Sequence, residues 1–148
     1  MRKRNGYSVL ELLVVFVIVG VLALIAYPSV RRGLRSNSVR GARTTVVTLY
    51  AKARASAVHR NRPTALRFSG NSAYVTADLG GGVLDTLGGV EDLHGRFGVS
   101  VSASDSVLWL DARGLGMGAG TSTTTIALTR DSEADTVEIS GFGRVVAQ

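Results

Sequence analysis

Residues 6–28 read GYSVLELLVVFVIVGVLALIAYP, and this stretch decides how the chain is organised. Between Tyr7 and Tyr27 only one side chain, that of Glu11, carries a charge. A helix of this length spans about 31 Å at 1.5 Å per residue, which matches a bilayer hydrocarbon core of about 30 Å. The stretch therefore predicts a transmembrane helix with a carboxylate near its start.

The position of Glu11 predicts a function for this helix beyond anchoring. A carboxylate at membrane depth costs roughly 2.5–3.5 kcal/mol on insertion scales, so it is expected to have a role and a charged partner. The preceding residues, Met1-Arg-Lys-Arg-Asn-Gly6, form a basic leader that ends in glycine. Cleavage after Gly6 would place a new ammonium group on Tyr7, four residues from Glu11. We therefore predict a processed precursor and an assembly charge pair between Tyr7 and Glu11.

A conventional secretory signal peptide is the main alternative for this segment. Such a peptide has an uninterrupted apolar region followed by a cleavage site of small residues. Here Glu11 interrupts the apolar region, and Leu24-Ile25-Ala26 lacks the small-x-small pattern. The sequence favours a retained helix.

The N-terminal segment resembles the class III signal of type IV pilins and pseudopilins. The features that carry this resemblance are the basic leader, Gly6, Glu11, the apolar stretch, Gly20 and Pro28. The resemblance implies that a prepilin peptidase cleaves after Gly6 and that the new N-terminus on Tyr7 is methylated. It also implies a leader in the cytoplasm, a head in the periplasm and assembly on an inner-membrane platform. Tyr7 departs from the Phe that usually begins the mature chain, and Ser8-Val9-Leu10 replaces the commoner Thr-Leu-Ile.

Gly20 and Pro28 mark two weak points in the predicted helix. Pro28 cannot donate to the carbonyl of Leu24 and disfavours helical geometry at Tyr27. Gly20 costs roughly 1 kcal/mol relative to alanine. A simple kink and a segment that extends when the subunit leaves the bilayer both fit this pattern, and the resemblance favours the second.

A second helical pattern follows Pro28 and predicts an amphipathic stalk. Its apolar or small residues recur every three to four positions, which defines one buried face; they are Val30, Leu34, Ser38, Ala42, Val46, Leu49, Ala53 and Ala57. Asn61-Arg62-Pro63 should end the helix. Residues 31–62 carry nine basic side chains and no acid, whereas residues 63–148 carry five basic and ten acidic groups. The arginines suit a solvated face, or contacts with lipid headgroups, with acidic neighbours in a filament, or with nucleic acid.

The remainder predicts a β-rich head. We expect strands at residues 64–68, 73–76, 97–101, 107–110, 124–129, 136–140 and 144–147. Residues 78–96 and 114–120 are expected to be glycine-rich loops. The order of elements, closing on Gly143-Arg144-Val145, resembles the GspH/FimT group of minor pilins and pseudopilins. The expected fold class is α+β, with a long N-terminal helix packed on an antiparallel, β-sandwich-like head.

No constellation of residues predicts a catalytic, cofactor or metal site, so the chain is not expected to be an enzyme. His59 and His94 lie far apart in sequence, and the chain has no cysteine. Asp131, Glu133 and Asp135 imitate the start of a calcium loop, but the glycine and the closing glutamate of that loop are missing. A polar hairpin tip accounts for them better.

The sequence thus predicts four segments: a leader (1–6), a transmembrane helix (7–28), a stalk helix (29–62) and a periplasmic head (63–148). The resemblance implies a single-pass inner-membrane minor pilin or pseudopilin, built into a type IV pilus or a type II secretion pseudopilus with other pilin subunits and in contact with the bilayer. A DNA-binding minor pilin for natural transformation is the alternative, with Arg144 as its contact. The missing second arginine after Arg144 and the acidic head do not favour nucleic acid.

Overall fold

The long N-terminal helix is present in the computed structural model, which describes residues 8–147. This helix, α1 (Val9–Arg60), runs through Gly20 and Pro28 as one continuous element. The chain forms two compact units, Met1–Leu34 and Arg35–Gln148. The second unit, which we call the head, contains the C-terminal part of α1 and every strand that the structure describes.

The C-terminus of α1 is closed by a left-handed residue. Asn61 adopts a φ of +50°, and its N–H donates to the carbonyl of Val58 at 3.3 Å. The N–H of Arg62 donates to the carbonyl of Ala57 at 3.2 Å. These two bonds form a Schellman motif, and Pro63 follows because it cannot continue a helix. The helix therefore ends immediately before the Asn61-Arg62-Pro63 sequence that predicted its end.

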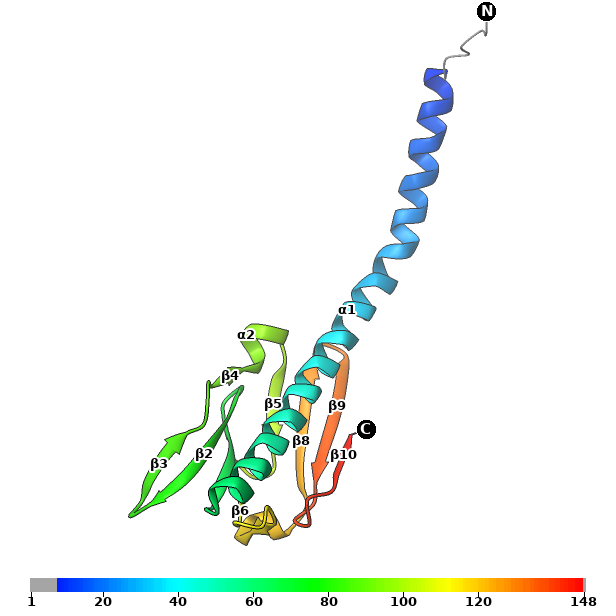
Figure 1. Cartoon of the computed structure of the whole chain (residues 1–148). Helices are drawn as coiled ribbons and strands as arrows, with labels where there is room; N and C mark the ends of the chain where they lie inside the picture. The colour runs from blue at the N-terminus through cyan, green and yellow to red at the C-terminus, as the bar shows by residue number, and fades with distance from the viewer. Residues whose placement is uncertain (1–7, 148) are drawn as a thin grey trace, which may run out of the picture. The chain divides into compact units, whose positions relative to one another are not determined.

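The strands form two antiparallel sheets (Figure 1). The first has the order β3-β2-β1-β6-β7, with β4 paired to β2, and consists of β1 (Thr64–Ser69), β2 (Ser72–Gly80), β3 (Val83–Thr86), β4 (Glu91–Asp92), β6 (Val107–Leu110) and β7 (Gly116–Met117). The second has the order β10-β9-β8-β5 and consists of β5 (Ser100–Ala103), β8 (Thr124–Arg130), β9 (Glu133–Ile139) and β10 (Val145–Ala147). Two short helices, α2 (Leu93–Phe97) and η1 (Gly118–Thr121), complete the head.

The core of the head lies between α1 and both sheets, so the predicted α+β class is confirmed. The helix lies across the two sheets within the head (Figure 1). Its buried residues are Val39, Ala42, Val46, Leu49, Tyr50, Ala53 and Ala57. They join Leu66 and Val75 of the first sheet and Ile126 and Leu128 of the second in one cluster. Three of the buried helix residues are alanines, and the hydroxyl of Thr64 in β1 donates to the carbonyl of Ala53 at 2.8 Å.

The predicted stripe on the stalk begins too early. Val30 and Leu34 are 60% and 61% exposed, whereas burial begins at Val39. Both exposed residues precede the head, and no strand is available there to cover them. The predicted spacing of the buried residues, every three to four positions, was right. The position at which burial starts depends on where the sheets lie.

The expectation of a loop over residues 78–96 is wrong. Strand β2 continues to Gly80, and the turn to β3 uses positive φ values at residues 80–82. The carboxylate of Asp92 accepts the N–H of Gly95 at 2.9 Å and caps α2, which the left-handed Gly98 ends. Asp92 is therefore an N-cap, which the sequence analysis overlooked. The expected strand at residues 97–101 accordingly starts only at Ser100, and the loop at 114–120 contains β7 and η1.

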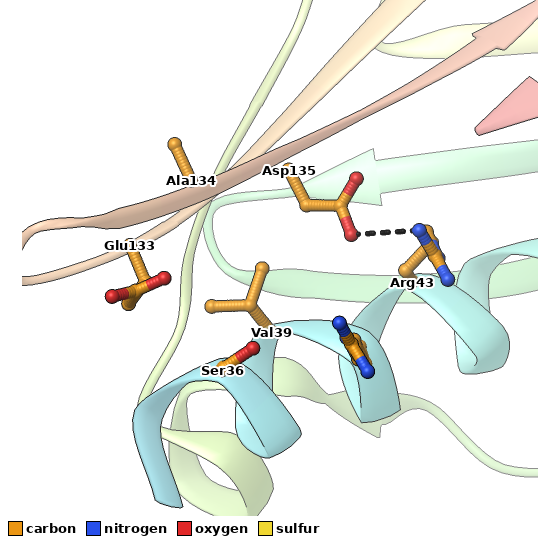
Figure 2. Close-up of a pocket in the computed structure, with 7 residues that line it drawn as sticks. Ser36, Val39, Arg43, Glu133, Ala134 and Asp135 are labelled. Atoms are coloured by element: carbon orange, nitrogen blue, oxygen red, sulfur yellow. Dashed lines mark ion pairs between the residues drawn. The ribbon is translucent and has the colours of Figure 1, made fainter. Parts of the chain in front are cut away.

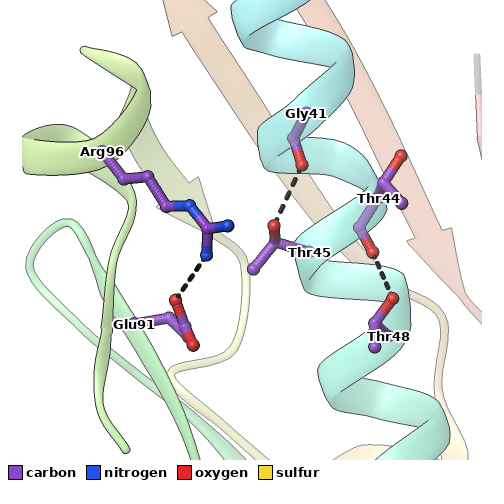
Figure 3. A network of polar contacts seen from close by, with 6 residues as sticks. All are labelled: Gly41, Thr44, Thr45, Thr48, Glu91 and Arg96. Atoms are coloured by element: carbon purple, nitrogen blue, oxygen red, sulfur yellow. Dashed lines mark hydrogen bonds and ion pairs between the residues drawn. The ribbon is translucent and has the colours of Figure 1, made fainter.

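Three threonines of α1, Thr44, Thr45 and Thr48, line a hollow together with Glu91 and Arg96 (Figure 3). The hydroxyls of Thr44, Thr45 and Thr48 donate to helix carbonyls four residues earlier, at 3.0, 3.0 and 2.8 Å. These bonds satisfy the hydroxyls within the helix. One turn earlier, a Cβ added to Gly41 would lie 2.8 Å from the Phe97 ring, so glycine permits α2 to pack there.

Replacing Gly41 with leucine should destabilise the head. The new side chain would displace the Phe97 ring, and overpacking of this kind typically costs about 1–3 kcal/mol. Gly33→Leu is the matched control, because a Cβ at Gly33 meets nothing within 4 Å. Thermal unfolding of the full chain in detergent, followed by near-UV circular dichroism, should show a lower Tm for G41L alone. Equal Tm values for the two variants would contradict this packing.

Asp111 organises the turn between β6 and β7. Its carboxylate accepts the backbone N–H groups of Arg113 and Leu115, both at 2.9 Å, and pairs with the Arg113 guanidinium at 2.8 Å. The backbone bond from Leu115, followed by the bonds from Arg113, holds the pKa of Asp111 below its ordinary value of 3.8, although desolvation opposes the shift. A carboxylate with a lowered pKa stabilises the fold above its unfolded pKa and loses that contribution as the pH falls.

Asp111→Asn should therefore lower Tm at pH 6 but leave a smaller difference from the unmodified chain near pH 2. Protonation removes the charge that makes these hydrogen bonds favourable, so the two proteins become alike in acid. Melting curves between pH 6 and pH 2 measure the effect. A difference in Tm that stays constant across this range would show that ionisation of Asp111 does not matter.

Candidate assembly site

The N-terminal unit exposes a continuous apolar surface. Every described residue from Ser8 to Leu34 is exposed. Within residues 8–147, α1 is the one helix long and apolar enough to cross a membrane, by length and composition, and none of its most apolar window is buried. A core helix of a soluble protein would be covered by its own chain, so this surface requires lipid or protein from outside.

Glu11 lies in the first turn of α1, on this exposed surface. None of the ion pairs within residues 8–147 involves its carboxylate. Gly6 and Tyr7, the predicted cleavage site and charge partner, lie outside the described residues. The predicted pair of Glu11 and the Tyr7 amino group is therefore still a prediction.

Ser8 and Glu11 have a role in capping the start of α1, which the sequence analysis did not predict. The Ser8 hydroxyl accepts the N–H of Leu10 at 3.3 Å, and the Ser8 carbonyl accepts the N–H of Leu12 at 3.2 Å. Ser8 is thus the N-cap, and Ser-x-x-Glu is the sequence signature of a capping box. An acid in the first turn also interacts favourably with the helix dipole. This local role supplies no full positive charge beside Glu11.

The two weak points and the flanking basic residues lie on the same exposed surface. A Cβ at Gly20 would meet nothing within 4 Å, and Pro28 lies inside α1. The guanidinium of Arg31 lies 4.6 Å from the centre of the Tyr27 ring, a cation–π contact at the end of the apolar stretch. Tyrosine and arginine at this position suit the boundary between lipid and water.

Within the head, two stalk arginines form ion pairs with the β8–β9 hairpin. Arg35 contacts Asp131 at 3.0 Å, and Arg43 contacts Asp135 at 3.0 Å. Figure 2 shows the second pair beside a hollow of about 220 Å³ that α1 and β9 line. The Asp135 side chain is only 10% exposed, whereas that of Asp131 is 60% exposed. Arg35 and Arg43 therefore form ion pairs within the head. The expectation of a solvated face did not include these pairs.

The same hairpin gives no sign of metal binding. Its turn consists of Asp131 and Ser132, because Arg130 pairs with Glu133 and β9 starts at Glu133. Among the residues that the structure describes, no group of three or more His, Cys, Asp or Glu side chains could hold a metal ion. Asp131, Glu133 and Asp135 thus lie at a polar hairpin end, a shorter one than the sequence indicated.

The candidate DNA contact, Arg144, lies just before β10 and is exposed. Its backbone N–H donates to the Ser140 hydroxyl at 3.1 Å, and its carbonyl accepts the N–H of Ser140 at 2.9 Å. These bonds fix the backbone of the turn but leave the guanidinium outside. A single exposed arginine carries no specific indication of nucleic-acid binding.

Replacing Arg43 with alanine should lower the stability of the head by about 1.5–3 kcal/mol, the range for a hydrogen bond to a charged group. The loss arises because the Asp135 side chain, only 10% exposed, would lose its ion-pair partner. Arg40→Ala is the matched control, since Arg40 is exposed on the neighbouring turn and lines the same hollow. Urea unfolding of both variants measures the difference. A loss below about 0.5 kcal/mol for R43A, as for ordinary surface changes, would contradict this role.

Comparison with known proteins supports both parts of the chain. Residues 1–27 match the model of the prokaryotic N-terminal methylation motif. Among curated proteins, no sequence matches the chain significantly. The type IV minor pilin FimU of Pseudomonas aeruginosa resembles the chain in two crystal forms. TM-scores are 0.61 and 0.58 at 17% identity, covering 76% and 74% of this chain and 89% and 91% of FimU.

A third solved structure resembles the chain at a TM-score of 0.55. It is the minor pseudopilin EpsH from the type 2 secretion system of Vibrio cholerae, with 10% identity over 72% of this chain and 95% of EpsH. These three structures are of pilin-like subunits rather than enzymes, and at such low identities the likeness concerns the fold. The chain thus combines a prokaryotic N-terminal methylation motif with the fold of the minor pilins and minor pseudopilins.

Proposed function

We propose that the chain is a minor pilin or minor pseudopilin, a structural subunit of a type IV pilus or of a type II secretion pseudopilus. The observation that carries this proposal is an exposed apolar helix with one carboxylate, joined to a head that has its own core. The methylation motif at residues 1–27 adds the expected processing at Gly6 and Tyr7. The similar solved structures include a type IV minor pilin, FimU, and a type 2 secretion pseudopilin, EpsH, so they support both kinds of filament equally. Nothing in these comparisons specifically supports the alternative of DNA binding.

The proposed assembly mechanism is charge pairing between subunits. Glu11 of an incoming subunit meets the Tyr7 ammonium of its neighbour, which prepilin peptidase creates by removing the leader. Each ion loses its water on entering the filament, and a buried ion is tolerable only when its partner is in place. The apolar surface from Val9 to Ile25 then packs against the same surface of other subunits. This packing replaces lipid, so the charge pair fixes the register more than it adds stability.

Gly20 and Pro28 have a proposed role in the same step. The residues between them are helical by composition, but both bounding residues disfavour a helix interior, so this part of α1 is weakly held. A segment that extends there lets the head adjust its height while Glu11 keeps its pairing. Before assembly the subunit is held in the inner membrane, with the head in the periplasm and the assembly platform as its partner.

Replacing Glu11 with glutamine should block incorporation into filaments without blocking processing. The amide keeps the size of the side chain but cannot neutralise the Tyr7 ammonium. Filaments sheared from cells and probed for this subunit should contain at least tenfold less of the E11Q chain. Val14→Ala is the control, because it changes the same exposed surface by two methyl groups and no charge. Intact mass of the membrane-bound chain should show removal of residues 1–6 in both variants.

Three results would contradict this proposal in different ways. Normal incorporation of E11Q would remove the charge pair from the mechanism. An intact Met1 in the mature protein would remove the processing step on which the Tyr7 ammonium depends. A cut near Ala26 would identify the apolar segment as a conventional signal peptide.

A further inference from the structure

Two arginines, Arg31 and Arg32, follow the apolar part of α1 directly. Both side chains are exposed, and no ion pair described within residues 8–147 involves either of them. Arg35, the next arginine along the helix, pairs with Asp131 instead. Residues 1–34 contain a single acid, Glu11, which precedes Arg31 by 20 positions. Arg31 and Arg32 are therefore two adjacent positive charges that no described acid of this chain neutralises.

The distance of these arginines from the apolar stretch matches the headgroup layer of a bilayer. Arg31 and Arg32 follow Tyr27 by four and five residues, about 6 and 7.5 Å along the helix axis. The headgroup layer is roughly 5–8 Å thick on each side of the hydrocarbon core. The Tyr27 ring, whose centre is 4.6 Å from the Arg31 guanidinium, holds that group at this level. When the apolar stretch spans the core, both guanidinium groups lie among lipid phosphates.

The spacing between Arg31 and Glu11 agrees with this placement. Their separation of 20 residues corresponds to about 30 Å of helix, the thickness of the hydrocarbon core. With Arg31 among the headgroups on one side, Glu11 lies at the opposite boundary, where water reaches its carboxylate. A helix held at this depth keeps Glu11 hydrated until the subunit is lifted out of the membrane.

We propose that Arg31 and Arg32 bind the phosphate groups of anionic phospholipids in the leaflet on the C-terminal side of the apolar stretch. A guanidinium donates two parallel hydrogen bonds to one phosphate, and two adjacent arginines favour lipids that carry no compensating ammonium group. Each arginine close to an anionic membrane surface increases binding about fivefold. This site deepens the proposed function and rests on it, because only a chain retained in the membrane keeps these arginines at the headgroups.

Lipid fits this place better than the other anions that the arginines could meet. An acidic neighbour in a filament, or a nucleic acid, would have to displace phosphates that already surround the helix at the membrane surface. Soluble anions also lack acyl chains, which pack on exposed apolar residues just before Tyr27, such as Leu24 and Ile25. A phospholipid therefore satisfies the apolar surface and the two charges with one molecule.

Native mass spectrometry of the full chain tests this site. The chain is released from micelles that contain equal amounts of phosphatidylglycerol, which is anionic, and phosphatidylcholine, which is zwitterionic. The unmodified chain should retain phosphatidylglycerol at least tenfold more often, because each of the two arginines contributes about fivefold. Arg31→Gln combined with Arg32→Gln should bring the ratio of the two lipids to within about twofold of one.

Arg40→Gln combined with Lys52→Gln is the matched control. Both residues are exposed on α1 within the head and take no part in a described ion pair, so this variant loses the same charge at another place. Its lipid ratio should equal that of the unmodified chain. Equal ratios in the two double variants would overturn the proposal, because the lipid preference would then not depend on Arg31 and Arg32.

Two competitors distinguish lipid from the other occupants. Glycerophosphoglycerol has the headgroup of phosphatidylglycerol without acyl chains, and a short DNA oligonucleotide presents phosphates along a nucleic acid. Neither should displace the lipid when its phosphate concentration equals that of phosphatidylglycerol. Displacement by the first would identify a site for soluble phosphate esters, and displacement by the second a site for nucleic acid. Either result would overturn the lipid site.

The outcome is separable from that of the filament function. The same spectra give the mass of the chain, so a cut near Ala26 is recognised directly and would overturn both proposals. If the lipid preference depends on Arg31 and Arg32 while incorporation ignores Glu11, the lipid site stands and the assembly charge pair is wrong. If incorporation depends on Glu11 and the lipid preference is absent, the filament role stands and the lipid site is wrong.

Discussion

The packing of one helix face on two sheets holds the head together. Ala42, Ala53 and Ala57 of α1 are fully buried, and the Thr64 hydroxyl at the start of β1 donates to the Ala53 carbonyl at 2.8 Å. The two sheets share this helix as common cover, and their buried residues meet in one cluster with it. Few other arrangements could bury both sheets in a head of this size without a disulfide. The stability of the head therefore depends on small residues at fixed positions along α1.

The packing of α1 on the sheets brings the basic stalk and the acidic head into contact. Arg35 and Arg43 reach Asp131 and Asp135, residues far away in sequence, because β8 and β9 run beside the helix. A basic stalk and an acidic head thus neutralise each other locally, and the Asp135 side chain is only 10% exposed. Exposed pairs such as Arg60 and Asp85 contribute little by comparison. The net charge of +6 consequently says little about partners of the folded head.

The N-terminal unit differs from the head, because nothing in the described chain covers its apolar residues. Its apolar surface is stable only in lipid or among other helices, and an acid in its first turn restricts which helices fit. A self-contained head and an uncovered helix are what a subunit needs if it is stored in a membrane and later built into a filament. In the head, Phe142 is the most exposed large hydrophobic residue that the structure describes, at 85%.

The sequence by itself determined the local features of this protein. Helix length, the stop at Asn61-Arg62-Pro63 and the lone Glu11 follow from period, turn residues and charge, which act over a few positions. The residues that the prediction missed depend on distant partners. Tertiary structure decided three such features. They are the position at which burial begins on α1, the ion pairs of Asp131 and Asp135, and the folding of residues 78–96 into strands and α2. The physical reason is that burial and ion pairing require the surface of another element, and only the folded chain brings that surface within reach.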